Sequence, residues 1–349
     1  MEKYMRMALE IARRGRGKVS PNPLVGAVIV KGGKVIAKGW HERYGGKHAE
    51  ANAIEKAGKK AKGADLYVTL EPCNHYGKQP PCTKAVIRAG IKRAFIAMED
   101  PNKLSRHGAK ELERNGIKVE KGICRHEAEK QNEFYIKGLR EGRPFVTLKI
   151  AMSSDGFISF GDGRAKRISG RASSDLVQKM RKEHDAVLVG INTVLRDDPL
   201  LTVRNDPESN PLRIVLDSKL SMPKSARMLV QKGETIIVCT EPVDARRRRE
   251  IAEHGGLVIV AGKKGSRVSL RDMLSELYKM GVQSVLVEAG NRVATSFLSE
   301  RLADRMVIIV SRRKITKGLK AFSLKRKIRF GISEHRPLGK DTIVVLEKV

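Results

Sequence analysis

Three residues with metal-binding side chains and one carboxylate lie close together near the start of the chain. They are His48, Cys73 and Cys82, and Glu50 stands two residues after the histidine. A structural zinc site is normally closed by four protein ligands, whereas a catalytic site has three and leaves one position open for water. One histidine and two cysteines therefore predict an open zinc site. Glu50, which is not needed as a ligand, would act beside the metal as general acid and base.

Three local elements are expected to position these side chains. Residues 48–50 run into a stretch of strong helix formers, 51–57, that ends at Gly58, so His48 and Glu50 should lie at the first turn of a helix. The apolar run 66–70 predicts a strand that leads to Cys73. Another helix, closed by a glycine, is expected to follow Cys82.

Cys73 is also expected to open a helix of its own. Pro72, which precedes it, fits a first helical turn, where a missing N–H group costs nothing. At such a position the positive end of the helix and the metal would both favour the thiolate form of Cys73.

The cysteines also have a simpler interpretation, because a free cysteine often behaves as a small buried apolar residue. Cys124 and Cys239 have no partner pattern, and Cys239 lies in a strand-like run, so we expect Cys239 in the core and Cys124 to be inert. A zinc-stabilised binding protein without catalysis remains an alternative. It would need a fourth ligand, for which Cys124 is the only spare thiol.

The spacing of the motifs points to a family. Zinc deaminases usually carry their two cysteines as Pro-Cys-x-x-Cys, whereas here eight residues separate Cys73 from Cys82. This longer insert resembles the deaminase half of the bifunctional riboflavin-biosynthesis deaminase/reductases. Residues 21–26 and 39–50 match the same family, and Gln79 stands where its members more often have threonine.

The resemblance implies a cytidine-deaminase-like three-layer α/β domain. Within it, zinc would be held by His48, Cys73 and Cys82, and Glu50 would be the catalytic residue. Secondary candidates for substrate contacts in the same pocket are Asn22, His41, Asn74 and His75.

The second half of the chain contains several sequence patterns. Each is a weak signal by itself, but together they point to one family. Residues 189–193 and 285–291 both run from a strand through a glycine to a helix, the geometry that cradles phosphate with backbone N–H groups. Residues 195–204 add acidic and basic groups in an expected loop. No GxGxxG fingerprint is present, so a Rossmann domain is not supported. With residues 149–156, these patterns are similar to the reductase half of the same family.

This second resemblance implies a dihydrofolate-reductase-like α/β domain that uses NADPH. The implied cofactor contacts are Ala151, Thr193, Asp197 and Gly290. The implied substrate contacts, with the ribose phosphate foremost, are Lys149, Ser153, Arg181, Leu201, Arg204 and Glu288. Arginine suits bidentate phosphate binding, which supports the two arginines independently. Arg167, Ala289 and Ser154 depart from the residues that many members carry.

The chain of 349 residues is long enough for two domains. A helix is predicted over 127–139, and the Gly-Arg-Pro sequence that follows favours a boundary between domains 1–144 and 145–349. The strand-like runs of the second domain begin at Phe145 and end near Val310.

The formal charge of +31 would suit nucleic acid or small anionic substrates. Aromatic residues are only 4% of the chain, whereas base-stacking proteins usually interleave them with basic residues. The cluster Arg246–Arg249 is flanked by acidic residues and predicts a solvated helix face. We therefore regard nucleic acid as an unfavoured partner, with a zinc-dependent tRNA or nucleic-acid deaminase and an RNA-binding second domain as the alternative function.

The sequence also bears on the compartment and assembly of the protein. It contains no apolar run long enough to span a bilayer and no signal-peptide pattern, and its few cysteines suit a reducing interior. We therefore expect a cytoplasmic protein without a membrane partner, and a homo-oligomer is compatible with the sequence.

The resemblance thus predicts a bifunctional riboflavin-pathway enzyme with a small phosphorylated pyrimidine as substrate. Zinc-hydroxide would deaminate 2,5-diamino-6-ribosylamino-4(3H)-pyrimidinone 5′-phosphate. NADPH would then reduce the ribose of 5-amino-6-(5-phosphoribosylamino)uracil to a ribityl chain.

Overall fold

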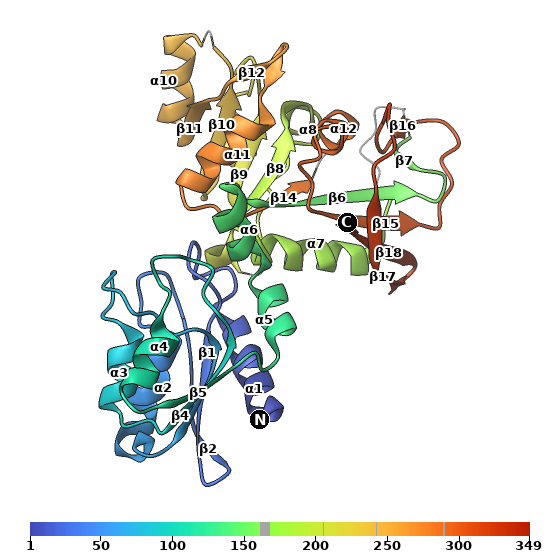
Figure 1. The fold of residues 1–349 in the computed structure, drawn as a ribbon. Coiled ribbons are helices and arrows are strands. Elements are labelled where there is room, and N and C mark those ends of the chain that lie inside the picture. Colours follow the sequence, from blue (N-terminus) through green and yellow to red (C-terminus); the bar gives the residue numbers. More distant parts are fainter. Residues whose placement is uncertain (161–167, 205, 242, 289) are drawn as a thin grey trace. The chain divides into compact units, whose positions relative to one another are not determined.

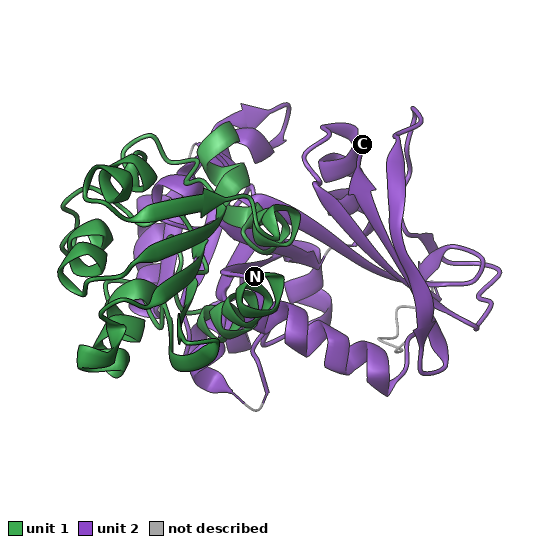
Figure 2. Cartoon of the chain, turned by 60° about the horizontal axis from the view of Figure 1, so that its bottom comes forward, with its two compact units in different colours: residues 1–142 green, residues 143–349 purple. Residues whose placement is uncertain are grey.

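The chain divides into two compact units, Met1–Gly142 and Arg143–Val349, which Figure 2 colours separately. The boundary predicted after Pro144 lies two residues further along. The computed structural model describes residues 1–160, 168–204, 206–241, 243–288 and 290–349. Arg167 and Ala289 lie outside the described residues. Within the described ranges, no helix is both long and apolar enough to cross a bilayer.

The first unit is a mixed sheet between two layers of helices (Figure 1). Helices α1 and α5 cover one face, and α2, α3 and α4 cover the other. This arrangement confirms the expected three-layer deaminase-like domain. In the sheet order β2-β1-β3-β4-β5, the strands are β1 (Gly26–Lys31), β2 (Lys34–Trp40), β3 (Asp65–Leu70), β4 (Arg93–Met98) and β5 (Lys118–Lys121). The helices are α1 (Glu2–Ala12), α2 (Ala49–Ala57), α3 (Cys82–Arg88), α4 (Gly108–Arg114), α5 (Arg125–Gln131) and α6 (Glu133–Glu141).

The single helix predicted over 127–139 is wrong, because α5 and α6 are separate helices that meet at Asn132. The Asn132 side chain is buried and bonds both backbone groups of Leu24. Its Oδ1 accepts from Leu24 N at 2.8 Å, and its Nδ2 donates to Leu24 O at 3.0 Å. These two hydrogen bonds to a loop distant in the sequence stabilise the break more than a continuous helix would. Such a tertiary contact cannot be predicted from the local sequence.

We expect Asn132→Ala to lower the free energy of unfolding of the first unit by about 2 kcal/mol, because it leaves the partly buried N–H and C=O of Leu24 without these partners. The chain has one tryptophan, Trp40, at the end of β2, so its fluorescence during urea unfolding reports this unit. Asn132→Asp keeps only the hydrogen-bond acceptor, so its free energy of unfolding should lie between those of the wild type and Asn132→Ala. Equal midpoints for all three proteins would contradict the role of Asn132.

The second unit is built on a large, mostly parallel sheet with the order β11-β10-β9-β8-β14-β6-β15-β18-β17 in the described chain. Its strands are β6 (Phe145–Ser153), β8 (Ala186–Gly190), β9 (Leu212–Leu216), β10 (Thr235–Cys239), β11 (Gly256–Val260), β14 (Ser284–Glu288), β15 (Arg305–Ser311), β17 (Phe330–Leu338) and β18 (Asp341–Lys348). Two small ribbons pair β7 (Phe157–Ser159) with β16 (Leu319–Lys320) and β12 (Lys263–Lys264) with β13 (Arg267–Val268). The helices are α7 (Arg171–Glu183), α8 (Ile191–Asp197), α9 (Arg227–Val230), α10 (Ala245–Glu253), α11 (Leu270–Lys279) and α12 (Asn291–Ser299).

Both faces of this sheet are buried, as expected for parallel strands. In β8, Ala186 and Leu188 join the apolar cluster under α11 and α12, whereas Val187 and Val189 join the cluster that includes Met180 of α7. Cys239 is fully buried in β10, as predicted. The α/β class of the second domain is therefore confirmed.

The C-terminal hairpin of β17 and β18 was missed by the sequence analysis, which ended its strands near Val310. Strand β18 pairs with β15, and β17 forms the sheet edge with mostly exposed polar residues. A half-solvated edge strand lacks the apolar run that was used to recognise strands.

Candidate active sites

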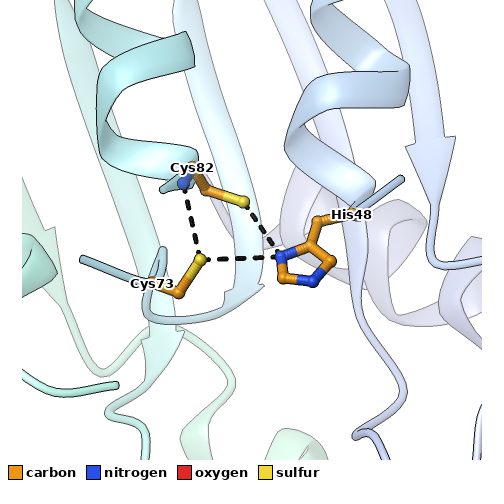
Figure 3. Close-up of side chains that lie close together, drawn as sticks. All are labelled: His48, Cys73 and Cys82. Carbon is orange, nitrogen blue, oxygen red and sulfur yellow. Dashed lines mark hydrogen bonds between the residues drawn. The ribbon is translucent and has the colours of Figure 1, made fainter. Parts of the chain in front are cut away.

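His48, Cys73 and Cys82 meet in the first unit (Figure 3). His48 Nδ1 lies 3.1 Å from Cys82 Sγ and 3.6 Å from Cys73 Sγ. All three candidate ligand atoms lie within 4.8 Å of one another. Ligand atoms of a tetrahedral zinc site are about 3.5 Å apart, given zinc–ligand bonds of about 2.0 to 2.3 Å. The three side chains thus form a ready set of zinc ligands.

Two helix starts and one loop position this cluster. His48 is the extended residue that precedes α2, and Cys82 is the first residue of α3, both as predicted. The helix predicted at Pro72 and Cys73 is wrong, because this segment is a loop after β3. Its backbone is already engaged, since Cys73 O accepts a hydrogen bond from the N–H of Thr83 in α3.

The helix end that reaches Cys73 therefore belongs to α3. The Cys82 N–H donates to Cys73 Sγ at 3.4 Å. Hydrogen bonds from Cys82, opposed by burial and supported by His48, lower the pKa of Cys73 to about 4. The hydrogen bond with Cys73 and burial raise the pKa of Cys82 well above its usual value. The two shifts are opposite in direction, so only one of these neighbouring sulfur atoms is favoured as a thiolate, and a divalent cation would favour both thiolates.

Glu50 lies in the first turn of α2 and is only 3% exposed. Its carboxyl group is a hydrogen-bond partner of the Cys82 thiol, which places it beside the cluster. Burial raises the pKa of Glu50 to about 7, against a lowering influence of His48. A carboxyl group with such a pKa both accepts and releases protons near neutrality.

Two of the other predicted pocket residues lie next to the metal ligands. The His41 ring packs edge-on against the His48 ring, with centroids 5.4 Å apart. His41 Nδ1 lies 3.1 Å from Lys47 O, and Nε2 lies 3.1 Å from Asn22 Nδ2. Because the Lys47 carbonyl can only accept, Nδ1 carries the proton and Nε2 accepts from the Asn22 amide. Burial lowers the pKa of His41, which favours this neutral form.

The other two predicted pocket residues, Asn74 and His75, lie in the insert between Cys73 and Cys82. Asn74 Oδ1 accepts from the Thr83 hydroxyl at 2.9 Å, which ties the insert to α3. His75 Nδ1 is buried and has no hydrogen-bond partner among the described residues. Gln79, the departure from threonine, donates to Gly45 O at 3.0 Å and so connects two loops of this unit. A threonine side chain is too short for the same bond.

Glu71 is a buried residue that the sequence analysis missed as a positioning group. Its Oε1 accepts from Ala109 N at 2.9 Å, and its Oε2 accepts from Asp100 N at 3.4 Å. It therefore holds α4 and the loop after β4 against the segment that carries Cys73. An acidic residue directly between an apolar strand and a proline was the available sequence signal.

In the second unit, the structure brings Lys149, Arg181 and Glu288 together. Arg181 Nε lies 2.6 Å from Glu288 Oε1, and Lys149 Nζ lies 3.5 Å from Glu288 Oε2. Burial acts to raise the pKa of Glu288, but the two cations outweigh it and lower the pKa. Lys149 and Glu288 are paired in register on the parallel strands β6 and β14.

The other predicted cofactor and substrate residues lie on several elements. Ala151 and Ser153 belong to β6, Thr193 and Asp197 to α8, Gly290 precedes α12, Arg204 is exposed, and the Leu201 side chain is buried. The loop predicted over 195–204 begins only after Asp197, because α8 extends to that residue. The Ser153 hydroxyl already donates to Asp155 Oδ1 at 2.5 Å and accepts from Phe157 N at 3.0 Å.

The carboxyl ends of β8 and β14 fit a dinucleotide. Gly190 is the last residue of β8 and precedes α8, and Gly290 lies after the end of β14 and precedes α12. A Cβ built on Gly290 would meet nothing within 4 Å, so the backbone is open to a close-lying ligand. Ligands of open α/β sheets bind at this edge, where helix N-termini favour phosphate.

We expect Glu288→Gln to destabilise the second unit by about 2 to 3 kcal/mol near neutral pH, because Lys149 and Arg181 lose their buried counter-charge. The pKa of Glu288 is lower in the folded state, so its contribution is present above its unfolded pKa and is lost as the pH falls through the folded value. The difference between the two proteins in thermal unfolding should thus shrink in acid. Glu276→Gln, at an exposed pair with Lys279, is the control. A difference independent of pH would contradict the ionised state of Glu288.

The fold and the cluster define a zinc-dependent deaminase domain followed by a second α/β domain with a dinucleotide-type edge. Comparison with known proteins agrees with this class. The cytidine and deoxycytidylate deaminase zinc-binding region matches residues 1–98, and the RibD C-terminal domain matches residues 144–312. The chain belongs to the RibD family of riboflavin biosynthesis proteins.

The similarity extends over the whole chain. It is 40% identical to the riboflavin biosynthesis protein RibD of Aquifex aeolicus, across 99% of this chain and 98% of that protein. It is 36% identical to RibD of Escherichia coli, with the same coverage. RibD of Acinetobacter baumannii superposes with a TM-score of 0.92 at 35% identity, covering 100% of this chain and 98% of that one. A diaminohydroxyphosphoribosylaminopyrimidine deaminase/5-amino-6-(5-phosphoribosylamino)uracil reductase of Thermotoga maritima gives a TM-score of 0.90 at 36% identity, with the same coverage.

Proposed function

We infer that the chain is a bifunctional enzyme of riboflavin biosynthesis. It deaminates 2,5-diamino-6-ribosylamino-4(3H)-pyrimidinone 5′-phosphate and then reduces the ribose of 5-amino-6-(5-phosphoribosylamino)uracil with NADPH. The observation that carries this conclusion is the His48, Cys73 and Cys82 cluster with buried Glu50, in a chain that matches RibD proteins from end to end.

His48, Cys73 and Cys82 would hold the zinc ion, and the fourth position stays open because no further ligand joins them among the described residues. When bound, zinc makes water a better nucleophile by lowering its pKa. Glu50 takes the proton of the attacking water on a carboxylate oxygen. The new C–O bond would form first, by addition of the water oxygen to the ring carbon, and the C–N bond would break once Glu50 has returned the proton to the departing ammonia.

Asn22, His41, Asn74 and His75 are proposed to contact the substrate in this pocket. The fixed tautomer of His41 and the amide of Asn22 give the pocket a defined pattern of donors and acceptors next to His48. The buried Nδ1 of His75 supports its assignment, because a ligand atom would supply its missing partner.

The second unit is proposed to bind NADPH through Ala151, Thr193, Asp197 and Gly290. NADPH supplies the hydride for the ribose carbon when bound. The substrate would be held by Lys149, Ser153, Arg181, Leu201, Arg204 and Glu288. Arg181 donates to Glu288 through Nε and Nη2 and to Thr202 O through Nη1, so its guanidinium is held in place, and its remaining N–H groups would serve a phosphate.

The nucleic-acid deaminase is not favoured, since the second unit matches a reductase-family domain rather than an RNA-binding module. The expected partner is a small phosphorylated pyrimidine. We propose a cytoplasmic enzyme, which the sequence composition favours, and a homo-oligomer remains compatible with it.

The direct test uses two assays on one protein preparation. Incubation with the diaminopyrimidinone nucleotide and zinc should release ammonia, and addition of NADPH should then cause loss of its absorbance at a rate that depends on the deaminated product. Ammonia release from tRNA or cytidine but not from the diaminopyrimidinone nucleotide would overturn the proposed function.

A further inference from the structure

One surface segment of the second unit carries many basic side chains and no acidic ones. Residues 312–329, which we call the basic strap, contain no aspartate or glutamate, and none occurs from 305 to 333. Every basic side chain of the strap is exposed, namely Arg312, Arg313, Lys314, Lys317, Lys320, Lys325, Arg326, Lys327 and Arg329. These residues account for nine of the 70 lysines and arginines within a short stretch, so they create a local excess of positive charge.

The basic strap is anchored through its apolar residues. Ile315 and Ala321 are buried, at 7% and 4% exposure. Phe322, Leu324 and Ile328 are partly buried and pack against the apolar core of this unit. The strap therefore holds its cations at the surface from a fixed backbone.

Hydrogen bonds attach the basic strap to the turn between β6 and β7. Ser154 N donates to Arg313 O at 2.9 Å, and Ala321 N donates to Gly156 O at 3.0 Å. The Asp155 carboxylate accepts from Thr316 N at 2.8 Å. This turn directly follows Ala151 and Ser153, two residues of the proposed reductase site.

The same strap also lies against the start of α12. Asn291 Nδ2 donates to Lys320 O at 2.9 Å, and Ser323 N donates to Thr295 Oγ1 at 3.0 Å. Asn291 is the residue after Gly290. The basic strap thus has direct hydrogen bonds to the turn after β6 and to α12, two of the three segments proposed to contact NADPH, and Figure 1 shows β16 of the strap and α12 in the same part of the unit.

The other dense basic cluster of this unit differs in its surroundings. Arg246–Arg249 on α10 lies beside acidic residues, and Arg246 and Arg247 both pair with Glu250. That cluster is therefore partly neutralised within its own helix, and it provides a comparison at similar exposure.

We propose that the basic strap is an electrostatic surface that attracts NADPH, the most highly charged small ligand of this enzyme, to the reductase site. This proposal rests on the proposed function. The strap acts through its long-range field on the phosphate groups of the dinucleotide, and its residues need no direct contact with them. Surfaces of one sign raise the local concentration of oppositely charged ligands and lose this effect in salt.

The test measures the dissociation constant of NADPH for the full chain by titration calorimetry, without turnover. The variant combines Lys325→Gln, Arg326→Gln and Lys327→Gln, three neighbouring cations outside the residues proposed to bind substrate or cofactor. At an ionic strength of about 10 mM, where the Debye length is about 30 Å, we expect the variant to bind NADPH about tenfold more weakly than the wild type. At about 1 M, where the Debye length is about 3 Å, the two should agree.

The matched control combines Arg246→Gln, Arg248→Gln and Arg249→Gln on α10, which removes the same charge elsewhere in the unit. It should bind NADPH with the salt dependence of the wild type. If both triple variants weaken binding equally, the effect is one of net charge and the proposal is wrong. The proposal is also overturned if the strap variant and the wild type bind NADPH with the same dissociation constant at low salt. This holds even if the variant loses a salt-sensitive complex with RNA. Absence of NADPH binding to the wild type would instead contradict the proposed reductase function.

Discussion

Replacing Glu50 with glutamine should abolish ammonia release while zinc remains bound. The carboxyl group is buried beside the Cys82 thiol and is not among the three clustered ligands, so its loss removes proton transfer and not the metal. General acid–base catalysis contributes about 100-fold to 10,000-fold, and we expect a fall of about a thousandfold in kcat for deamination. The measurement is ammonia release at saturating substrate, with zinc content determined on the same sample.

Glu55→Gln is the matched control for this variant. Glu55 lies on the same helix α2, but it is exposed and pairs with Lys47. This control should retain deamination, and both variants should oxidise NADPH normally when they are given the deaminated substrate. Substantial deamination by Glu50→Gln would show that another group carries the proton.

Removing one thiol of the cluster should have a different signature, the loss of both zinc and deamination. In Cys82→Ala only His48 and Cys73 remain, which is too few ligands for a stable zinc site. We expect zinc content to fall from about one ion per chain to near zero, and ammonia release to fall by at least about a thousandfold, since the metal supplies the activated water. The measurement is metal analysis after dialysis, together with ammonia release.

Cys124→Ser provides the control for this prediction, because Cys124 is not among the clustered ligands. It should keep zinc and deamination. NADPH-dependent reduction should persist in Cys82→Ala, because the proposed reductase residues all belong to the other unit. A Cys82→Ala protein that retains one zinc ion would contradict the ligand set.

The metal cluster could be predicted from sequence because its signals are local. His48 precedes a run of strong helix formers and Cys82 opens another helix, and both positions are confirmed. The conformation at Cys73 could not be predicted in the same way. Pro72 is compatible with a helix start, but the segment is held as a loop by bonds to α3, which is distant from it until the chain folds.

The same distinction explains the other errors. Asn132 interrupts a good helical sequence in order to bond Leu24, more than a hundred residues away in the chain. In the second unit, buried parallel strands such as β8 were recognised by their apolar runs, whereas β17 is an exposed edge strand without one. The grouping of Lys149, Arg181 and Glu288 was implied by family resemblance, and the ion pairs that orient them required the structure.

The most direct test of two reactions on one chain is the mass of the product formed from the diaminopyrimidinone nucleotide with zinc and NADPH. We expect a product that has exchanged one amino group for oxygen and gained two hydrogen atoms. With Glu50→Gln, the doubly converted product should be absent from this substrate, but it should form from the deaminated nucleotide. A wild-type product that is deaminated yet never reduced would contradict the assignment of the second unit.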